Sequence, residues 1–238
     1  MQFLKIKRQN RVAKDGKPRA KAMVVKKDRK YGNVIEEHQI KTRQSVLITG
    51  AHSSGKSYWL DRLYKDYARI WATRSEHKPV YLSALLPLTA WTDGKHFELW
   101  WALRFNPDEE RHWSKLKAHE RLDALPLYLE ETEALLFVDD AHNLNGRKLK
   151  LVQSCVRSAG IFVIAASEEG RLSPSLRQDV LHVEPQIFRL DSEVAYDATA
   201  ILMWLFILIA AGLGAYELAA VLGGLKMLSG GSRATKQN

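Results

Sequence analysis

The sequence predicts an α/β domain with a mostly parallel sheet of about five strands flanked by helices, joined to a basic N-terminal arm and a C-terminal transmembrane helix. Three observations support this fold class. Short apolar, β-branched runs recur between segments with helical spacing, as in parallel strands that are covered on both faces. The excess positive charge lies in the first 44 residues, and a long uncharged stretch lies near the C-terminus.

The N-terminal arm, residues 1–44, contains 14 Lys and Arg against 4 Asp and Glu, a net charge of +10, whereas the whole chain carries +9. Two short runs, 3–6 and 22–25, could pair as a small hairpin, but their apolar content is low for independent folding. The charge suits polyanions, either nucleic-acid phosphates or anionic lipid headgroups. A solvated tail without a ligand is the third interpretation.

Residues 45–190 contain the candidate strands of the globular domain. Four of them are strongly apolar: 46–49, 79–83, 134–138 and 161–166. A fifth, 182–190, contains Pro185, which lacks a backbone N–H and so confines the strand to an edge or an end. The single cysteine, Cys155, excludes a disulfide framework and a cysteine-rich metal site, and its helical surroundings predict a small core residue.

Residues 84–131, between the second and third candidate strands, form a helical insertion rich in aromatic residues and charge. Aromatic residues at this spacing are more typical of a core or a subunit interface than of a platform on which bases stack. They are Trp91, Phe97, Trp100, Trp101, Phe105 and Trp113.

Between the first candidate strand and a helical pattern, residues 50–57 read Gly-Ala-His-Ser-Ser-Gly-Lys-Ser, a complete G-x-x-x-x-G-K-[ST] phosphate-binding loop (P-loop). Glycines permit a tight turn whose backbone N–H groups face phosphate oxygens, and the helix N-terminus adds positive charge. Lys56 is expected to reach the β- and γ-phosphates, and Ser57 to hold Mg²⁺. The candidate ATP-binding residues are Gly50, Ala51, His52, Ser53, Ser54, Gly55, Lys56 and Ser57.

A second motif, Leu135-Leu136-Phe137-Val138-Asp139-Asp140, is an apolar strand that ends in two carboxylates, the Walker B pattern. Asp139 is expected to organise the Mg²⁺ shell beside the phosphate loop. Asp140 is placed to orient or deprotonate the attacking water. Its alternative role is to cap the following helix. The chain has no Asn/Thr-Lys-x-Asp guanine-reading motif, which favours ATP over GTP.

Over residues 43–190 the chain resembles the AAA+ and related P-loop ATPases, which have an extra strand between the two motifs. The resemblance implies a polar sensor at Ser167, which follows the strand 161–166. It also implies an arginine finger or sensor, Arg171 or Arg177, reaching a neighbouring subunit of a homo-oligomer; a plain surface arginine is the alternative. Two features depart from the family. Asp140 stands where a glutamate is usual, and a helical lid after the fifth strand is missing.

From residue 198 to 216 the chain has 19 residues without a charge, and after Glu217 the run 218–225 is again apolar. Such a stretch predicts a transmembrane helix over 198–225, followed by a short polar tail, 226–238. One span is slightly favoured over a re-entrant hairpin. The lipid bilayer is then a partner, and the expected location is a bacterial or phage/mobile-element inner membrane with the ATPase domain in the cytoplasm.

The sequence therefore predicts a membrane-anchored, slow AAA+-like ATPase that couples its nucleotide state to oligomerisation or to the handling of DNA or an unidentified protein partner. Two alternatives remain. One is a motor for phage assembly, secretion or conjugation, and the other is a nucleotide-gated scaffold without significant turnover.

Overall fold

The computed structural model describes residues 2–9, 16–29, 31–74, 76–105, 112–190, 205–209 and 212–215. The chain divides into two compact units, Met1–Ser192 and Glu193–Asn238. The first unit contains the predicted α/β domain together with the predicted N-terminal arm.

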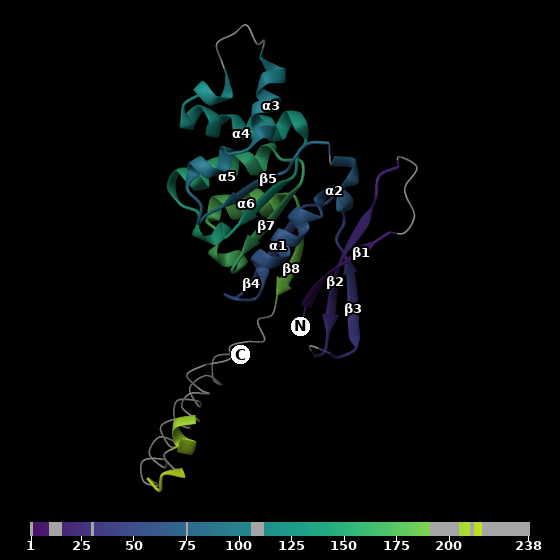
Figure 1. Ribbon diagram of the computed structural model, residues 1–238, viewed down its shortest axis with the longest axis vertical. Helices are drawn as coiled ribbons and strands as arrows, with labels where there is room; N and C mark the ends of the chain where they lie inside the picture. The colour runs from purple at the N-terminus through teal and green to yellow at the C-terminus, as the bar shows by residue number, and fades with distance from the viewer. Residues whose placement is uncertain are drawn as a thin grey trace. The chain divides into compact units, whose positions relative to one another are not determined.

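Five parallel strands form the central sheet of the first unit (Figure 1). Their order in space is β5-β6-β7-β4-β8, so β7 lies between the strand that precedes the phosphate loop and the strand of the Walker B motif. This confirms the expected extra strand. The fifth candidate strand also lies at an edge, as expected, because β8 is the last strand in this order, and Pro185 directly precedes it. The strands are β4 (Val46–Gly50), β5 (Val80–Ser83), β6 (Leu136–Asp139), β7 (Phe162–Ala166) and β8 (Gln186–Leu190).

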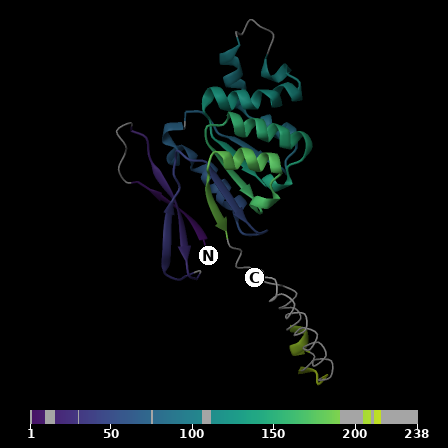
Figure 2. The same ribbon diagram turned by 180° about the vertical axis from the view of Figure 1, so that it is seen from behind.

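Helices cover both faces of this sheet, as Figures 1 and 2 show from opposite sides. Alternate strand residues point to opposite faces. Thus Leu136 and Val138 of β6 pack in the core shared with α4, α5 and α6, whereas Phe137 packs in the core shared with α1 and α2. The α-helices of the unit are α1 (Lys56–Lys65), α2 (Tyr67–Ile70), α3 (Lys95–Arg104), α4 (Ala118–Thr132), α5 (Gly146–Ser158) and α6 (Pro174–His182).

Short 3₁₀ turns connect several of these elements. They are η1 (Ala72–Arg74), η2 (Leu88–Thr92), η3 (Trp113–Lys115), η4 (Ala141–Asn143) and η5 (Glu169–Arg171). Of these, η4 and η5 follow β6 and β7 directly, which places them at the carboxyl edge of the sheet, where α/β proteins bind their ligands.

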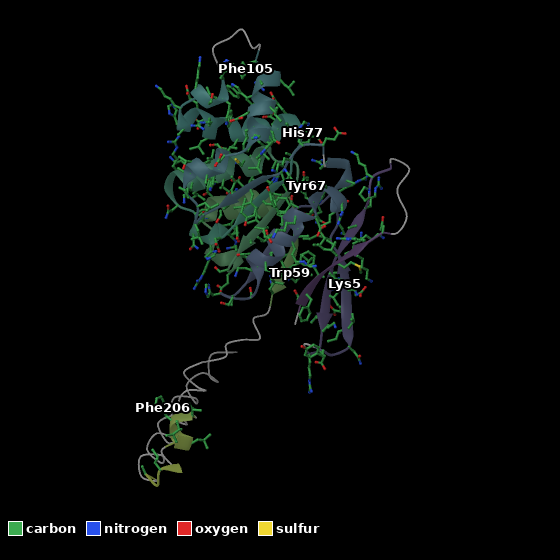
Figure 3. All side chains as sticks on the ribbon, viewed as in Figure 1. Lys5, Trp59, Tyr67, His77, Phe105 and Phe206 are labelled. Carbon is green, nitrogen blue, oxygen red and sulfur yellow. The ribbon has the colours of Figure 1, made fainter. Side chains whose placement is uncertain are left out.

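The predicted N-terminal arm contains a three-stranded antiparallel sheet, β1 (Gln2–Arg8), β2 (Ala20–Lys27) and β3 (Val34–Gln39). Its apolar residues share one core with α1, α2 and the central sheet, among them Leu4, Val24 and Ile40. Figure 3 shows Trp59 and Tyr67, from α1 and α2, on the side of the domain next to this sheet. The arm's low apolar content is therefore sufficient, because the α/β domain supplies the rest of the core.

The predicted insertion forms η2, α3, η3 and α4 between β5 and β6. Trp91, Phe97, Trp100 and Trp113 are buried in the same core as the α4 side of the central sheet. Phe97 stacks on Trp113 with ring centroids 5.7 Å apart, and it meets Tyr128 of α4 edge-on at 5.0 Å. The aromatic residues thus build a core, as expected. Cys155 is also buried there, and burial raises the pKa of its thiol to about 12.

The predicted transmembrane helix over residues 198–225 is wrong. Across the described part of the chain, none of the helices combines the length and the apolar character that crossing a bilayer demands. Within 198–225 the structure describes 205–209, which are helical, and 212–215, whereas a span needs about 20 residues. The remainder of that segment and the tail 226–238 lie outside the described residues. The bilayer partner and the membrane location were derived from this helix and are corrected with it.

Candidate functional site

The phosphate loop lies between β4 and α1, and its two glycines are required by geometry. Gly55 precedes α1 with φ of +86°, a left-handed conformation that side chains disfavour. A Cβ on Gly50 would lie 2.5 Å from the Leu190 carbonyl oxygen, so only glycine fits there beside β8. The Gly50 N–H donates to the Ser167 carbonyl oxygen at 3.0 Å, which joins the start of the loop to the end of β7.

Lys56 is held inside this loop. Its Nζ donates to the carbonyl oxygens of Gly50 and Ala51, both at 2.8 Å, and the residue is 7 % exposed. Burial lowers the pKa of Lys56, while the carboxylates of Asp140 and Asp139 oppose that shift. Within the described part of the chain, the hydrogen-bond acceptors of this cation are carbonyl oxygens, which a phosphate oxygen can replace.

The candidate metal ligands converge as predicted. The Ser57 hydroxyl, in the first turn of α1, donates to Asp139 Oδ1 at the end of β6 over 3.1 Å. The Asp140 backbone N–H donates to the same oxygen at 2.9 Å. Asp139 is 6 % exposed, so its carboxylate is fixed in a buried position. A hydroxyl and a carboxylate are the hard oxygen ligands that Mg²⁺ takes, with waters and phosphate oxygens filling its other positions.

Tyr81 is a site residue that the sequence analysis missed. Its hydroxyl donates to Asp139 Oδ2 at 3.3 Å, so both oxygens of this carboxylate are hydrogen-bonded. Burial raises the pKa of Tyr81, and the adjacent Asp139 raises it further, so the hydroxyl keeps its proton. No motif marks this residue. It reaches Asp139 only because β5 pairs with β6, with Ser83 opposite Asp139.

Asp140 follows Asp139 in a left-handed conformation, with φ of +52° and ψ of +38°. It stands before η4 but makes no capping hydrogen bond through its side chain, so the capping alternative is not realised. Burial raises the pKa of Asp140, and Asp139 adds to the rise, whereas His142, Lys56 and His52 oppose it. A partly buried carboxylate of raised pKa is a suitable proton acceptor.

Ser167 follows β7, as predicted for a sensor, and is 8 % exposed. Its hydroxyl oxygen is buried and has no hydrogen-bond partner among the described residues. Its backbone N–H donates to Nδ1 of His142 at 3.3 Å. Burial lowers the pKa of His142, which favours the neutral ring with its proton on Nε2. Through this hydrogen bond, His142 of η4 joins the ends of β6 and β7.

The two candidate arginines occupy different places. Arg171, in η5, lines the same cavity as the phosphate loop of its own chain. Arg177, in α6, is exposed and does not line that cavity. Ser83, at the end of β5, accepts a hydrogen bond from the Leu85 N–H at 3.3 Å and also lies outside the cavity lining.

These residues surround a cavity of about 820 Å³, here called the phosphate-loop cavity. It lies within the size range of small-molecule and cofactor sites. Of the predicted loop residues, Gly50 and Ser54 do not line it, and Asp139 lies behind Ser57. The lining residues that were predicted from sequence are Ala51, His52, Ser53, Gly55, Lys56, Ser57, Asp140, Ser167 and Arg171.

No protein-family model matches the sequence. No curated protein matches it either. Solved structures show a limited likeness to the chain, and three of them illustrate it. Cdc6p from Pyrobaculum aerophilum is 21% identical, with a TM-score of 0.37 over 61% of this chain and 38% of that chain.

The Thermotoga maritima RuvB Holliday junction branch migration motor is 18% identical, with a TM-score of 0.31 over 71% of this chain and 43% of that chain. The cytoplasmic domain of the Thermomonospora curvata type VII secretion ATPase EccC is 16% identical, with a TM-score of 0.39 over 74% of this chain and 23% of that chain. The matched part therefore spans less than half of each of these proteins. At such identities and scores, the likeness assigns neither a family nor a function.

Proposed function

We propose that the chain binds ATP with Mg²⁺ in the phosphate-loop cavity and hydrolyses it slowly, and that its nucleotide state governs oligomerisation or the binding of DNA or a partner protein. The observation that carries this proposal is the 3.1 Å contact between the Ser57 hydroxyl and Asp139. This contact supports the proposal because a hydroxyl and a carboxylate, the kinds of oxygen that Mg²⁺ binds, lie next to a phosphate loop that holds a buried lysine.

Binding begins with the loop. The Lys56 ammonium exchanges the carbonyl oxygens of Gly50 and Ala51 for oxygens of the β- and γ-phosphates, because a phosphate oxygen carries more negative charge than a carbonyl. Backbone N–H groups of the loop and the N-terminus of α1 add donors and positive potential. Ser57 and Asp139 would hold Mg²⁺, which prefers such oxygen ligands.

Hydrolysis then needs a positioned water. When bound, Mg²⁺ would supply positive charge that offsets the negative charge of the phosphates. Asp140 accepts the proton of the water as its oxygen bonds to the γ-phosphorus, and the bond from that phosphorus to the bridging oxygen breaks, giving ADP and phosphate. The unpartnered Ser167 hydroxyl and the cationic Arg171 line the cavity where they can contact the transferred phosphoryl group.

A nucleotide-gated scaffold without significant turnover is the second candidate function. Asp140 favours it, because its carboxylate is one methylene shorter than the usual glutamate and stands on a left-handed residue. A base that is held short of the attacking water would leave ATP binding intact and make hydrolysis very slow.

The test is phosphate release and ATP binding by the full-length chain. Wild type should bind ATP and release phosphate, Lys56→Ala should lose both, and Asp140→Asn should bind ATP but lose release. Lys65→Ala, which removes an exposed lysine at the far end of α1, is the matched control and should change neither. Equal release by wild type and Asp140→Asn would select the scaffold, and wild type that fails to bind ATP would overturn the proposal.

A further inference from the structure

A second cavity, of about 190 Å³, lies where the three-stranded sheet meets α2, and is here called the sheet–α2 cavity. Apolar residues of both elements, among them Ala22, Ile40 and Ile70, contribute to its lining and are themselves buried. Its polar lining residues are Gln9, Arg19, Lys21, Gln39, Thr42 and Arg69. The cavity is separate from the phosphate-loop cavity, with which it shares no lining residue.

The charge of the sheet–α2 cavity has one sign. Among the described lining residues, Arg19, Lys21 and Arg69 are cationic, and no lining residue is an aspartate or a glutamate. Arg69 forms an ion pair with Asp66, with 3.4 Å between guanidinium nitrogen and carboxylate oxygen, and Asp66 does not line the cavity. The apolar lining residues strengthen the attraction between these charges and an anion, because the low local dielectric screens the interaction less than water does.

The pairing of β1 with β2 adds to this local excess. Lys7 lies directly opposite Lys21 in the antiparallel register. Like charges opposite each other destabilise a sheet. Lys7 has an acidic partner, Glu37, at 3.4 Å, but within the described ranges Lys21 has none. A bound anion would offset this repulsion between Lys7 and Lys21.

The size of the cavity limits the ligand. Sites for cofactors and drug-sized molecules start at about 300 Å³. The sheet–α2 cavity is smaller than that, so it suits one tetrahedral anion rather than a nucleotide. Guanidinium groups such as those of Arg19 and Arg69 bind phosphate oxygens in pairs, and side-chain amides and hydroxyls can donate to the remaining oxygens.

We propose that the sheet–α2 cavity binds a single phosphate group through Arg19 and Arg69. The phosphate belongs either to the backbone of a nucleic acid or to a small phosphate ion or monoester. In the first case, the cavity fixes one phosphate of the nucleic-acid backbone at a defined place on the three-stranded sheet. The sequence alone shows only that this part of the chain is basic. The proposal does not depend on ATP hydrolysis at the other cavity.

The test uses the full-length chain with Lys56→Ala as background, so that the phosphate loop does not bind the probes. Two double variants are compared. Arg19→Gln/Arg69→Gln removes two charges from the cavity, and Lys5→Gln/Lys115→Gln removes two exposed charges elsewhere. Thermal unfolding of each variant checks the fold, and the single variant Lys21→Gln serves if the first double variant unfolds.

One arm measures the binding of a fluorescent 20-nucleotide single-stranded DNA at several salt concentrations. Loss of one phosphate contact should weaken binding several-fold and reduce the slope of log K against log salt by about 0.7. The other arm titrates inorganic phosphate by calorimetry. Loss of DNA affinity only in the cavity variant identifies a backbone phosphate, and loss of phosphate binding alone identifies a small ligand. If neither changes, or both double variants weaken DNA binding equally, the proposal is overturned.

Discussion

The Ser57 hydroxyl and the Asp139 carboxylate lie 3.1 Å apart although 82 residues separate them in the chain. Ser57 lies in the first turn of α1 and Asp139 ends β6, and β7 lies between β6 and β4, the strand that precedes the phosphate loop. The contact exists because the phosphate loop turns back over the carboxyl ends of these strands. It is the point at which the two sequence motifs become one site.

Ser57→Ala should abolish the gain in ATP affinity that Mg²⁺ produces, while binding in the presence of a metal chelator stays near the wild-type value. The reason is that the substitution removes one metal ligand and leaves Lys56 and the loop backbone in place. Fluorescent-nucleotide titrations with and without Mg²⁺ measure the difference. Ser54→Ala makes the same change in the same loop outside the cavity lining and should keep the Mg²⁺ effect. Equal loss in both variants would contradict the assignment.

Tyr81→Phe should raise the Mg²⁺ concentration needed for half-maximal ATP binding by about fivefold, because a hydrogen bond worth about 1 kcal/mol no longer fixes Asp139. Without Mg²⁺, its ATP affinity should match that of wild type. Tyr67→Phe is the control, because Tyr67 belongs to the same aromatic cluster but its hydroxyl does not contact Asp139. A Mg²⁺ requirement that moves equally in both variants would reduce Tyr81 to a packing residue.

Asp140→Asn should raise the melting temperature of the nucleotide-free protein at pH 7, and the gain should shrink as the pH falls towards 4. The pKa of Asp140 is raised in the folded state above its ordinary 3.8, chiefly by burial. The folded protein therefore holds the proton more tightly than the unfolded chain, so ionised Asp140 destabilises the fold above its folded pKa and not below its unfolded pKa.

Melting curves from pH 4 to pH 8 without Mg²⁺ test this pH dependence. Asp123→Asn, an exposed aspartate on α4, makes the same charge change and should show no such trend. Asparagine also tolerates a left-handed residue better than most, which would add a gain that does not vary with pH. If the gain in melting temperature is the same from pH 4 to pH 8, burial of the Asp140 charge is not its cause.

Leu4→Ala should lower the free energy of unfolding by about 2 to 4 kcal/mol, and the three-stranded sheet and the α/β domain should still unfold together. Leu4 is 4 % exposed in the core that both share, and its carbonyl oxygen accepts a hydrogen bond from Arg62 of α1 at 2.8 Å. Denaturant curves followed by tryptophan fluorescence and circular dichroism measure both effects. Leu99→Ala, at a residue that is 67 % exposed, should change stability by less than about 0.5 kcal/mol. Two separate transitions in wild type would contradict the shared core.

Much of the central sheet was predictable, because its strands are buried on both faces and read as continuous apolar runs. The predicted run 161–166 differs from β7 by one residue, and 46–49 differs from β4 by one residue. The phosphate loop and the Walker B strand were predictable for another reason. Their chemistry requires particular residue types at fixed spacing, so the motif and the geometry carry the same information.

The three-stranded sheet was harder to predict. Two of the four buried residues of β2, Ala20 and Ala22, are small, and every residue of β3 is exposed, so the alternation of apolar and polar residues is weak. The role of Tyr81 depends on the register between β5 and β6, which no local pattern encodes. For the apolar segment 198–225, the sequence analysis predicted too much structure. Hydropathy alone predicted a membrane span that the described residues do not contain.

The bond from the Gly50 N–H to the Ser167 carbonyl oxygen belongs wholly to the backbone. A survey that replaces one side chain at a time would therefore leave this link in place at Ser167, and at Gly50 it would report the clash of a new Cβ with Leu190 instead. The tie between the loop and the end of β7 is thus invisible to mutational scanning. Replacing the amide itself, for example by an ester linkage at residue 50, is the change that exposes its contribution.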